Sequence, residues 1–272
     1  MTLFDKFLRI RELGIFSIIV VFVIVAAVID PRFMTLDSWR AVFLAIPLIL
    51  VMAMGQMMVI ICRHVDISIG SILAFAAITI GFVFIHYPAT SLWMALLITA
   101  SVGTIMGLVN GIIVTRFNVH SIIVTLGTLS LYRGLVFIVS GGRQIDRNDI
   151  PVHIISFSQT SFLFSIPAIL ILSVIIVLIT YLIMRHSVLG REIYATGSNP
   201  EAAHLKGINV TKVTLFCFGV CGMLAGVAGL FYASRFGYVN PGVTGVGIEF
   251  IVIAGVIIGG TSITGGSGSV LG

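Results

Sequence analysis

Long apolar runs separated by short polar stretches dominate the sequence from residue 14 onward. Most runs reach the roughly 18 apolar residues that a helix needs to cross a bilayer. They do not alternate polar and apolar side chains as the strands of a membrane barrel do. The pattern predicts an all-α polytopic transmembrane helix bundle of about eight spanning segments, because helices satisfy their own backbone in lipid. The segments are 14–29, 41–62, 67–86, 92–114, 121–140, 162–184, 212–233 and 248–260.

Composition leads to the same fold class. Of the 272 residues, 58% are hydrophobic and only 9% are charged, and the mean hydropathy is +1.19. A soluble domain carries about a quarter charged residues, so lipid is expected to be the main solvent of this chain. The first apolar run follows Lys6, Arg9 and Arg11 and has no small-residue cleavage site, which favours a retained signal anchor.

Basic residues predict the orientation. Lys and Arg concentrate on the cytoplasmic side of a membrane protein, and a cytoplasmic N-terminus places more of them inside than outside. The expected inner residues are Lys6, Arg9, Arg11, Arg63, Arg116, Arg185, Arg191, Lys206 and Lys212, and the outer ones are Arg32, Arg40, Arg143, Arg147 and Arg235. The net charge of +5 is spread between apolar runs, so no nucleic-acid partner is expected.

The longest inner polar segment, 185–212, contains the signals of a short helix. Asn199 is placed as its N-cap, Pro200 as its first residue and Gly207 as its C-terminal stop. A helix of about two turns is not stable alone. It therefore packs on a partner chain, or else on its own bundle or on lipid headgroups.

Small residues predict close helix packing. Gly103, Gly107 and Gly111 recur at every fourth position of one span, and Gly222 and Gly226 do so in another. Such spacing lets helices approach closely in lipid. The buried-looking cysteines Cys62, Cys217 and Cys221 are interpreted as packing residues rather than as a disulfide or metal site. The glycine-rich stretch 259–268 is expected to be a re-entrant or cytoplasmic turn.

Ionisable residues at membrane depth are candidates for a polar path, because charges in lipid usually face the bundle interior. The candidates are Asp66, Arg133 and Glu249, with Asn110, Thr125, Thr128 and Ser130 as polar neighbours. The alternative for Asp66 and Glu249 is a helix start, where the dipole favours a carboxylate. Arg133 could instead reach the membrane surface. The chain has no GxxxxGK[ST], HExxH, CxxC or GxSxG, so neither ATP binding by a phosphate loop nor an enzyme is expected.

Four stretches together resemble the permease subunit of bacterial ABC sugar importers of the ribose/xylose/arabinose type. They are VDISIGS (65–71), NGIIVTRFNVHSIIVTLGTLSLYRGL (110–135), LGREIYATGSNPEAAHLKGI (189–208) and IEFIVIAGVIIGGTSITGGSGSVLG (248–272). Most members have glycines where this chain has Cys62-Arg63-His64-Val65. The basic residue at this place, together with LYRGL and SGGRQI further along the chain, resembles the autoinducer-2 and rhamnose permeases more closely.

The resemblance implies a single permease domain over 1–272 in the bacterial inner membrane, with a coupling loop at 185–212. It implies an ATPase subunit that binds ATP-Mg, a second permease chain (identical or related) and a periplasmic substrate-binding protein, with no cofactor in this chain. The coupling residues would be Asn199, Pro200, Glu201, Ala202, Ala203 and Gly207. Because members usually continue beyond the glycine-rich stretch, we expect one or two further helices to be missing. The solute would be a pentose, rhamnose or autoinducer-2.

An ion-coupled secondary transporter of a small polar solute is the alternative. It would need coupling carboxylates deep in the bundle and often has inverted repeats. Asp66 and Glu249 stand near expected helix starts, and no clear repeat is visible. A channel or a membrane scaffold is a third interpretation, which would not need a cytoplasmic docking helix.

Overall fold

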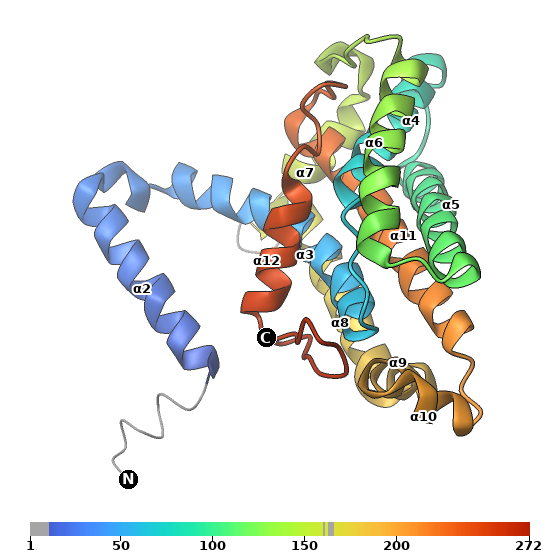
Figure 1. Cartoon of the computed structure of the whole chain (residues 1–272). Coiled ribbons are helices and arrows are strands. Elements are labelled where there is room, and N and C mark those ends of the chain that lie inside the picture. The colour runs from blue at the N-terminus through green and yellow to red at the C-terminus, as the bar shows by residue number, and fades with distance from the viewer. Residues whose placement is uncertain (1–10, 160, 163–165) are drawn as a thin grey trace, which may run out of the picture.

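The computed structural model describes residues 11–159, 161–162 and 166–272, and it is a helical bundle (Figure 1). The predicted polytopic helical fold is confirmed. In chain order the elements are α2 (Arg11–Ile29), η1 (Pro31–Met34), α3 (Leu36–Ile61), α4 (Ile69–His86), α5 (Leu92–Phe117), α6 (Ser121–Ser140), η2 (Arg147–Asp149), α7 (Val152–Gln159), β1 (Ser161–Phe162), β2 (Ile166–Pro167), α8 (Ala168–His186), α9 (Val188–Ser198), α10 (Pro200–Leu205), α11 (Val210–Phe236) and α12 (Ile248–Ile258).

Six helices within the described residues are long and apolar enough to cross a membrane, namely α3, α4, α5, α6, α8 and α11. Two shorter apolar helices, Ser17–Ile29 within α2 and α12, occupy the other two predicted segments. α12 has 11 residues, so it is about 16 Å long at 1.5 Å per residue. This is roughly half of a hydrocarbon core of about 30 Å, so α12 alone is too short for the full span predicted at 248–260.

The predicted span 162–184 begins later in the structure. Residues 161–162 pair antiparallel with 166–167, and α8 starts at Ala168. Residues 163–165 of that prediction lie outside the described residues. Pro167 explains the late start, because the residue before a proline is pushed toward extended backbone, and Ile166 is accordingly in a strand.

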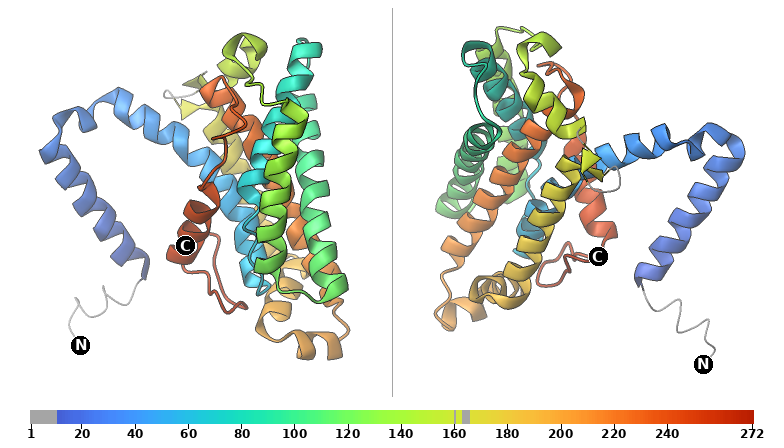
Figure 2. Two further views of the ribbon diagram at one scale, coloured as in Figure 1. Left: turned by 45° about the horizontal axis from the view of Figure 1, so that its top comes forward. Right: turned by 180° about the vertical axis from the view of Figure 1, so that it is seen from behind.

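α11 is the central helix of the bundle and packs against α3, α4 and α5 (Figure 2). The contact with α5 is made by glycines: a Cβ built on Gly222 would lie 2.2 Å from the Gly103 carbonyl oxygen. Only hydrogen fits there, which confirms the close packing predicted from the small residues. The three cysteines are buried and free, and Cys62 Sγ lies 3.4 Å from Cys217 Sγ in this core.

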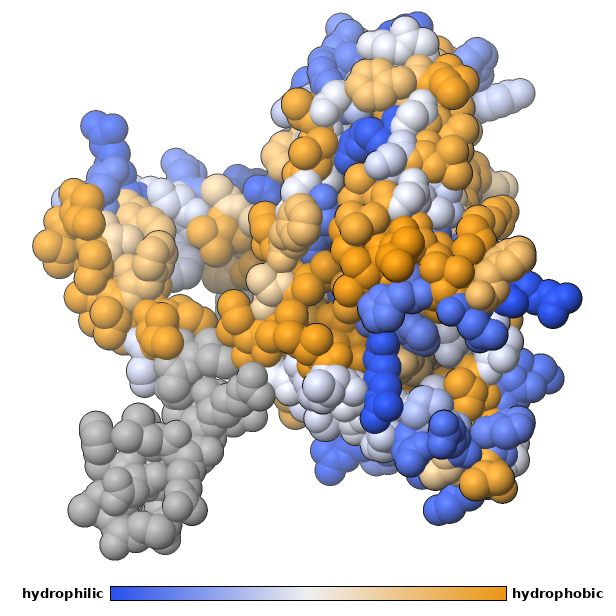
Figure 3. All heavy atoms as spheres, in the orientation of Figure 1, coloured by the Kyte–Doolittle hydropathy of each residue, from blue (hydrophilic) through white to orange (hydrophobic). Residues whose placement is uncertain are grey.

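The outer surface is apolar over much of its middle. In Figure 3 hydrophobic residues cover most of the central part of the visible face, and hydrophilic residues gather toward its two ends. α2 and the beginning of α3 extend away from the other helices in every view (Figures 1 and 2). Exposed leucine, isoleucine, valine and phenylalanine side chains line α2, α5, α6 and α8. Such a surface is suited to lipid rather than to water.

Two helices, α7 and α9, were not predicted. α9 was missed because its sequence is polar, yet its buried residues follow one helical face at Gly190, Ile193, Thr196 and Gly197. α9 and α10 together form one end of the bundle, beyond α8 and α11 (Figure 1).

Candidate functional site

α10 is a short helix with an ordered cap at each end. Asn199 Oδ1 accepts a hydrogen bond from the Ala202 amide at 3.0 Å, and Pro200 occupies the first position, where its missing N–H is not needed. At the other end Gly207 has a φ of 84°, and the Ile208 amide donates to the Ala203 carbonyl. This is the hydrogen-bond pattern of a Schellman stop. The predicted helix and both of its end signals are therefore present.

The predicted coupling residues on and beside α10 differ in exposure. Ala203 is only 3% exposed, and α10 packs on α9 and α11, so Ala203 belongs to the contact with its own bundle rather than to the free surface. Glu201, Ala202, His204, Lys206 and Gly207 are exposed. Leu205, which the sequence analysis missed, is 87% exposed.

The linker between α3 and α4 carries a buried polar cluster. Asp66 is fully buried and accepts hydrogen bonds from the Ser68 amide at 2.8 Å and the Ser68 hydroxyl at 2.7 Å. Asn110 of α5 donates to Asp66 at 3.3 Å and to Ser68 Oγ at 2.8 Å. Tyr132 of α6 donates to Asn110 Oδ1 at 3.2 Å. Asp66 precedes α4 instead of capping it, and hydrogen bonds from its own linker and from α5 hold its carboxylate in place.

Neighbouring side chains fix the backbone of the same linker. With its amide oriented to satisfy both groups, Gln56 donates to the Asp66 carbonyl and accepts from the Asp66 amide, each at 3.2 Å. Ser121 Oγ accepts from the Val65 amide at 3.0 Å, and Thr125 Oγ1 donates to the Val65 carbonyl at 3.3 Å. The extended linker therefore has its polar backbone groups satisfied inside the bundle, as apolar surroundings require.

Arg133 and Glu249 form a second polar group near the beginning of α12. Arg133 Nη1 donates to the Thr244 carbonyl at 2.6 Å in the loop before α12, and Arg133 and Glu249 attract each other electrostatically. Glu249 is 6% exposed and its Oε2 has no hydrogen-bond partner. A Cβ built on Gly70 would lie 2.3 Å from that oxygen. The carboxylate thus rests against the first turn of α4 while it stands in the first turn of α12, and both helix dipoles favour its negative charge.

The structure separates the predicted path residues into groups. Asp66, Asn110 and Thr125 belong to one hydrogen-bonded cluster, whereas Arg133 and Glu249 stand apart from it and interact electrostatically without a hydrogen bond between them in the described residues. Thr128 is buried, but its hydroxyl bonds the Thr125 carbonyl of its own helix, and Ser130 bonds the Leu126 carbonyl. These two hydroxyls satisfy local backbone groups.

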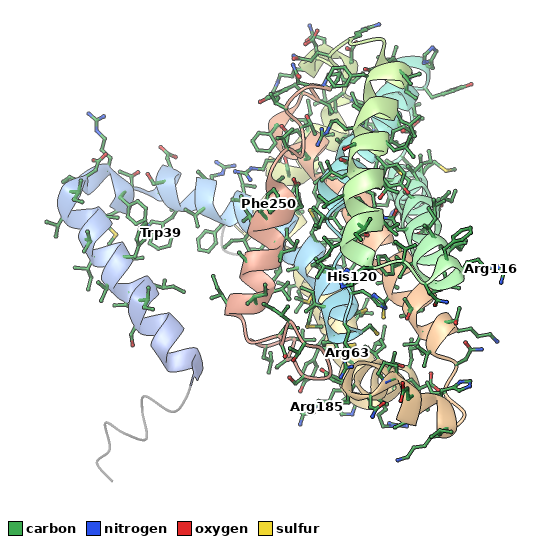
Figure 4. All side chains as sticks on the ribbon, viewed as in Figure 1. Trp39, Arg63, Arg116, His120, Arg185 and Phe250 are labelled. Atoms are coloured by element: carbon green, nitrogen blue, oxygen red, sulfur yellow. The ribbon has the colours of Figure 1, made fainter. Side chains whose placement is uncertain are left out.

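The sequence analysis missed Gln56, Ser68 and Tyr132 as members of the polar interior, and it missed the contacts of Arg63, which is exposed. Tyr132 stands beside Arg133 in an apolar run, and Gln56 is the only amide side chain of α3. A polar residue alone in a spanning segment was the available signal. Arg63 lies where the α3–α4 linker meets the α9–α10 end of the bundle (Figure 4).

His64, the next linker residue, is half-buried beside the Phe218 ring, with ring centroids 5.8 Å apart. Burial, with a smaller contribution from the positive charge of nearby His120, lowers the pKa of His64 to about 4. His64 is therefore neutral at neutral pH and adds no charge to the linker.

Comparison with known proteins gives one consistent result. A family described as branched-chain amino acid transport system / permease component matches residues 40–272. The autoinducer 2 import system permease protein LsrC of Yersinia pseudotuberculosis serotype O:1b (strain IP 31758) is 34% identical over 245 residues, which cover 90% of this chain and 68% of the relative. LsrC of Yersinia enterocolitica serotype O:8 / biotype 1B (strain NCTC 13174 / 8081) is 35% identical over 245 residues, 90% and 66% of the two chains. No solved structure matches.

Proposed function

This chain belongs to the permease-component family of branched-chain amino acid transport systems, and from that premise we propose that it forms the membrane path of an ATP-driven importer. The fold supports this role, because a multi-pass bundle with a polar interior can enclose a path through lipid. The relatives named above are autoinducer 2 import permeases. The proposed solute is accordingly a sugar or sugar-like molecule, with autoinducer 2, rhamnose and pentoses as the candidates to test.

α10 is the observation that carries the proposal. It is a six-residue helix, capped at both ends and set at the end of the bundle, with Leu205 87% exposed. A helix this short is not stable by itself. Because both of its ends are nevertheless capped, we infer that its exposed face serves as a contact surface. We assign this surface to an ATPase subunit that hydrolyses ATP-Mg, with Glu201, Ala202 and Leu205 facing it and Ala203 anchoring α10 to the bundle. A second permease chain and a periplasmic binding protein would complete the importer.

The proposed orientation places the α10 end in the cytoplasm of an inner-membrane protein, with the N-terminus on the same side. Basic residues support it: Arg116 ends α5, Arg185 ends α8, and Arg191 and Lys206 lie on α9 and beside α10. Figure 4 shows Arg63, Arg116 and Arg185 in the half of the bundle that carries α10. Lys and Arg favour the cytoplasmic side of a membrane.

The polar interior supplies the proposed path. We propose that a hydroxylated solute interacts with two groups of polar side chains, one with Asp66, Asn110 and Thr125 and the other with Arg133 and Glu249. Since ATP is bound by the partner, this chain contributes gating and partner contact. Oε2 of Glu249 has no hydrogen-bond partner, and we propose it as an acceptor for a hydroxyl hydrogen of the solute.

Purification from native membranes in mild detergent, with mass spectrometry of the retained proteins, tests this proposal. We expect a stoichiometric ATPase with a phosphate-binding loop to accompany the wild-type chain. Leu205→Asp should lose most of that ATPase without lowering the thermal midpoint of the chain, because exposed substitutions change stability by only about 0.5 kcal/mol. Val152→Asp is the matched control, because Val152 of α7 is 81% exposed away from α10.

Two results would contradict the proposal. A wild-type chain that purifies alone in every mild detergent would remove the ATPase partner. Solute uptake driven by a proton gradient, without ATP, would instead establish the ion-coupled alternative, with Asp66 and Glu249 as its coupling carboxylates.

A further inference from the structure

The turn after α3 places an arginine where glycine is the favoured residue. Arg63 N donates to the Ile60 carbonyl at 2.9 Å and His64 N donates to the Val59 carbonyl at 3.0 Å, which is the Schellman pattern. Arg63 has a φ of 68°, in the left-handed region where a Cβ is strained and glycine is not. The arginine therefore needs a compensating interaction of its side chain.

That interaction is with the C-terminus of α9. Arg63 Nε donates to the Gly197 carbonyl at 2.5 Å, and Nη2 donates to the Ser198 carbonyl at 2.6 Å. These carbonyls lack their usual helical donors, because α9 ends at Ser198 and the Ala202 amide is bonded to Asn199 Oδ1. The positive guanidinium also complements the negative end of the α9 dipole. Arg63 is thus a cap for α9 supplied from a distant segment.

Glycines bring three backbones together around this cap. A Cβ built on Gly197 would lie 1.8 Å from the Ile61 carbonyl oxygen, and one on Gly265 would lie 2.9 Å from the same oxygen. The Gly266 amide donates to the Ile61 carbonyl at 2.9 Å. The end of α3, the end of α9 and the glycine-rich turn after α12 therefore meet with direct backbone contacts at the Ile61 carbonyl. Close-packed backbone of this kind transmits a displacement instead of absorbing it.

The contact between Arg63 and the end of α9 lies between α10 and the buried Asp66 cluster, the two parts of the chain that the proposed function must connect. On one side, Ser198 is followed directly by Asn199 and α10. On the other side, Arg63 is three residues from Asp66, whose carboxylate is bonded to Ser68 and Asn110. A continuous route thus runs from the exposed helix to the buried cluster, through the backbone 198–199, the two hydrogen bonds of Arg63 and the backbone 63–66. Coupling between distant sites can be carried by such a network of hydrogen bonds and rigid segments.

We propose that Arg63 is a positioning residue that transmits displacement of α10 to the Asp66 linker, so that ATP hydrolysis on a bound partner changes the polar interior. This inference rests on the proposed function, in which an ATPase binds α10. Arg63 contacts neither solute nor ATPase in this scheme. Its contribution is the pair of hydrogen bonds to the Gly197 and Ser198 carbonyls.

Arg63→Gly is the informative variant, because glycine suits the left-handed turn and only the guanidinium is lost. Arg63→Lys keeps the charge but not the two fixed donors of the guanidinium. Arg191→Ala is the control, since Arg191 is an exposed arginine of α9. Each variant is assembled with the ATPase and binding protein in proteoliposomes. ATPase retention, ATP hydrolysis and solute uptake are then measured.

We expect Arg63→Gly to retain its ATPase and to hydrolyse ATP, while solute taken up per ATP falls roughly tenfold, within the usual range of coupling between sites. Arg63→Lys should lie between Arg63→Gly and the wild type, and Arg191→Ala should stay within about twofold of the wild type. A loss of fold would affect hydrolysis and uptake together, so a fall in the ratio alone identifies transmission. Uptake per ATP within about twofold of wild type in Arg63→Gly would overturn the inference.

A second measurement needs no variant. Hydrogen–deuterium exchange of the wild-type complex, with and without ATP, should change together in peptides covering 61–68 and 194–203. A change confined to 194–203 would overturn the inference and leave the importer intact. A wild-type chain that binds no ATPase would instead refute the proposed function and this inference with it.

Discussion

The contact between α5 and α11 provides the sharpest test of the fold, through Gly222→Ala. The new Cβ would lie 2.2 Å from the Gly103 carbonyl oxygen and 2.8 Å from the Gly107 Cα. Ordinary contact begins at 3.4 Å, so the shortfall at the carbonyl is about 1.2 Å. Both neighbours are backbone atoms that cannot rotate away, so the two helices must separate or shift along each other.

The expected loss combines two opposing effects. Overpacking of a well-packed interior costs roughly 1–3 kcal/mol, and replacing glycine by alanine inside a helix returns up to about 1 kcal/mol. Since α11 also packs on α3 and α4, the separation disturbs more than one interface. We therefore expect a net loss of about 1–2 kcal/mol in the free energy of unfolding.

The assay is the thermal midpoint of the purified chain in one detergent, followed by size-exclusion chromatography after heating. Gly127→Ala is the matched control: Gly127 lies within α6, and a Cβ built there meets nothing within 4 Å. This control should be neutral or stabilising by up to about 1 kcal/mol. Gly103→Ala combined with Gly222→Ala should cost less than the sum of the two, because both force the same separation. A midpoint for Gly222→Ala equal to that of Gly127→Ala would refute the close packing.

Two further predictions concern the interior and the linker. Asn110→Ala removes the amide that bonds Asp66, Ser68 and Tyr132, and should lower the free energy of unfolding by about 2–4 kcal/mol because a buried carboxylate loses a donor. Thr115→Ala on the same helix, whose hydroxyl bonds only the backbone of its own helix, should cost far less in the same thermal assay, and equal losses would contradict this account. His64 has a folded-state pKa of about 4 against an ordinary value of 6.5, so the unfolded chain binds the proton more readily. The contribution of neutral His64 to the free energy of unfolding is therefore complete above about pH 6.5 and is lost as the pH falls toward about 4. The thermal midpoint should fall less steeply between about pH 7 and about pH 4.5 in His64→Gln than in the wild type, and parallel curves would argue against burial of the imidazole.

Local signals account for the elements that were predicted well. α10 was found because Asn199, Pro200 and Gly207 each act on the backbone within a few residues, through a cap, a fixed φ and a left-handed stop. The six long spans were found because an apolar run of that length has one solution in lipid. The start of α8 was misplaced because Pro167 outweighed the apolar run before it.

Nonlocal packing accounts for what was missed. Ala203 was predicted as a coupling residue, and only the structure shows that it is buried, in a helix that packs on α9 and α11. Arg63 was used in the sequence analysis only as a basic residue that predicts orientation. Its hydrogen bonds to the carbonyls of residues 197 and 198 were not foreseen. No local pattern connects residues that far apart in the chain.

The sequence by itself determined that this chain is a helical membrane protein, where most of its spans lie and where a capped helix interrupts the polar loop, because hydropathy and end signals act over one helix length or less. Tertiary structure alone decided that Asp66 is held by Ser68 and Asn110, that Glu249 rests against α4, and that Arg63 caps α9. These contacts depend on how the glycine faces of α5 and α11 set the helices beside each other. That arrangement is a property of the whole bundle, because each helix finds its position only against its neighbours.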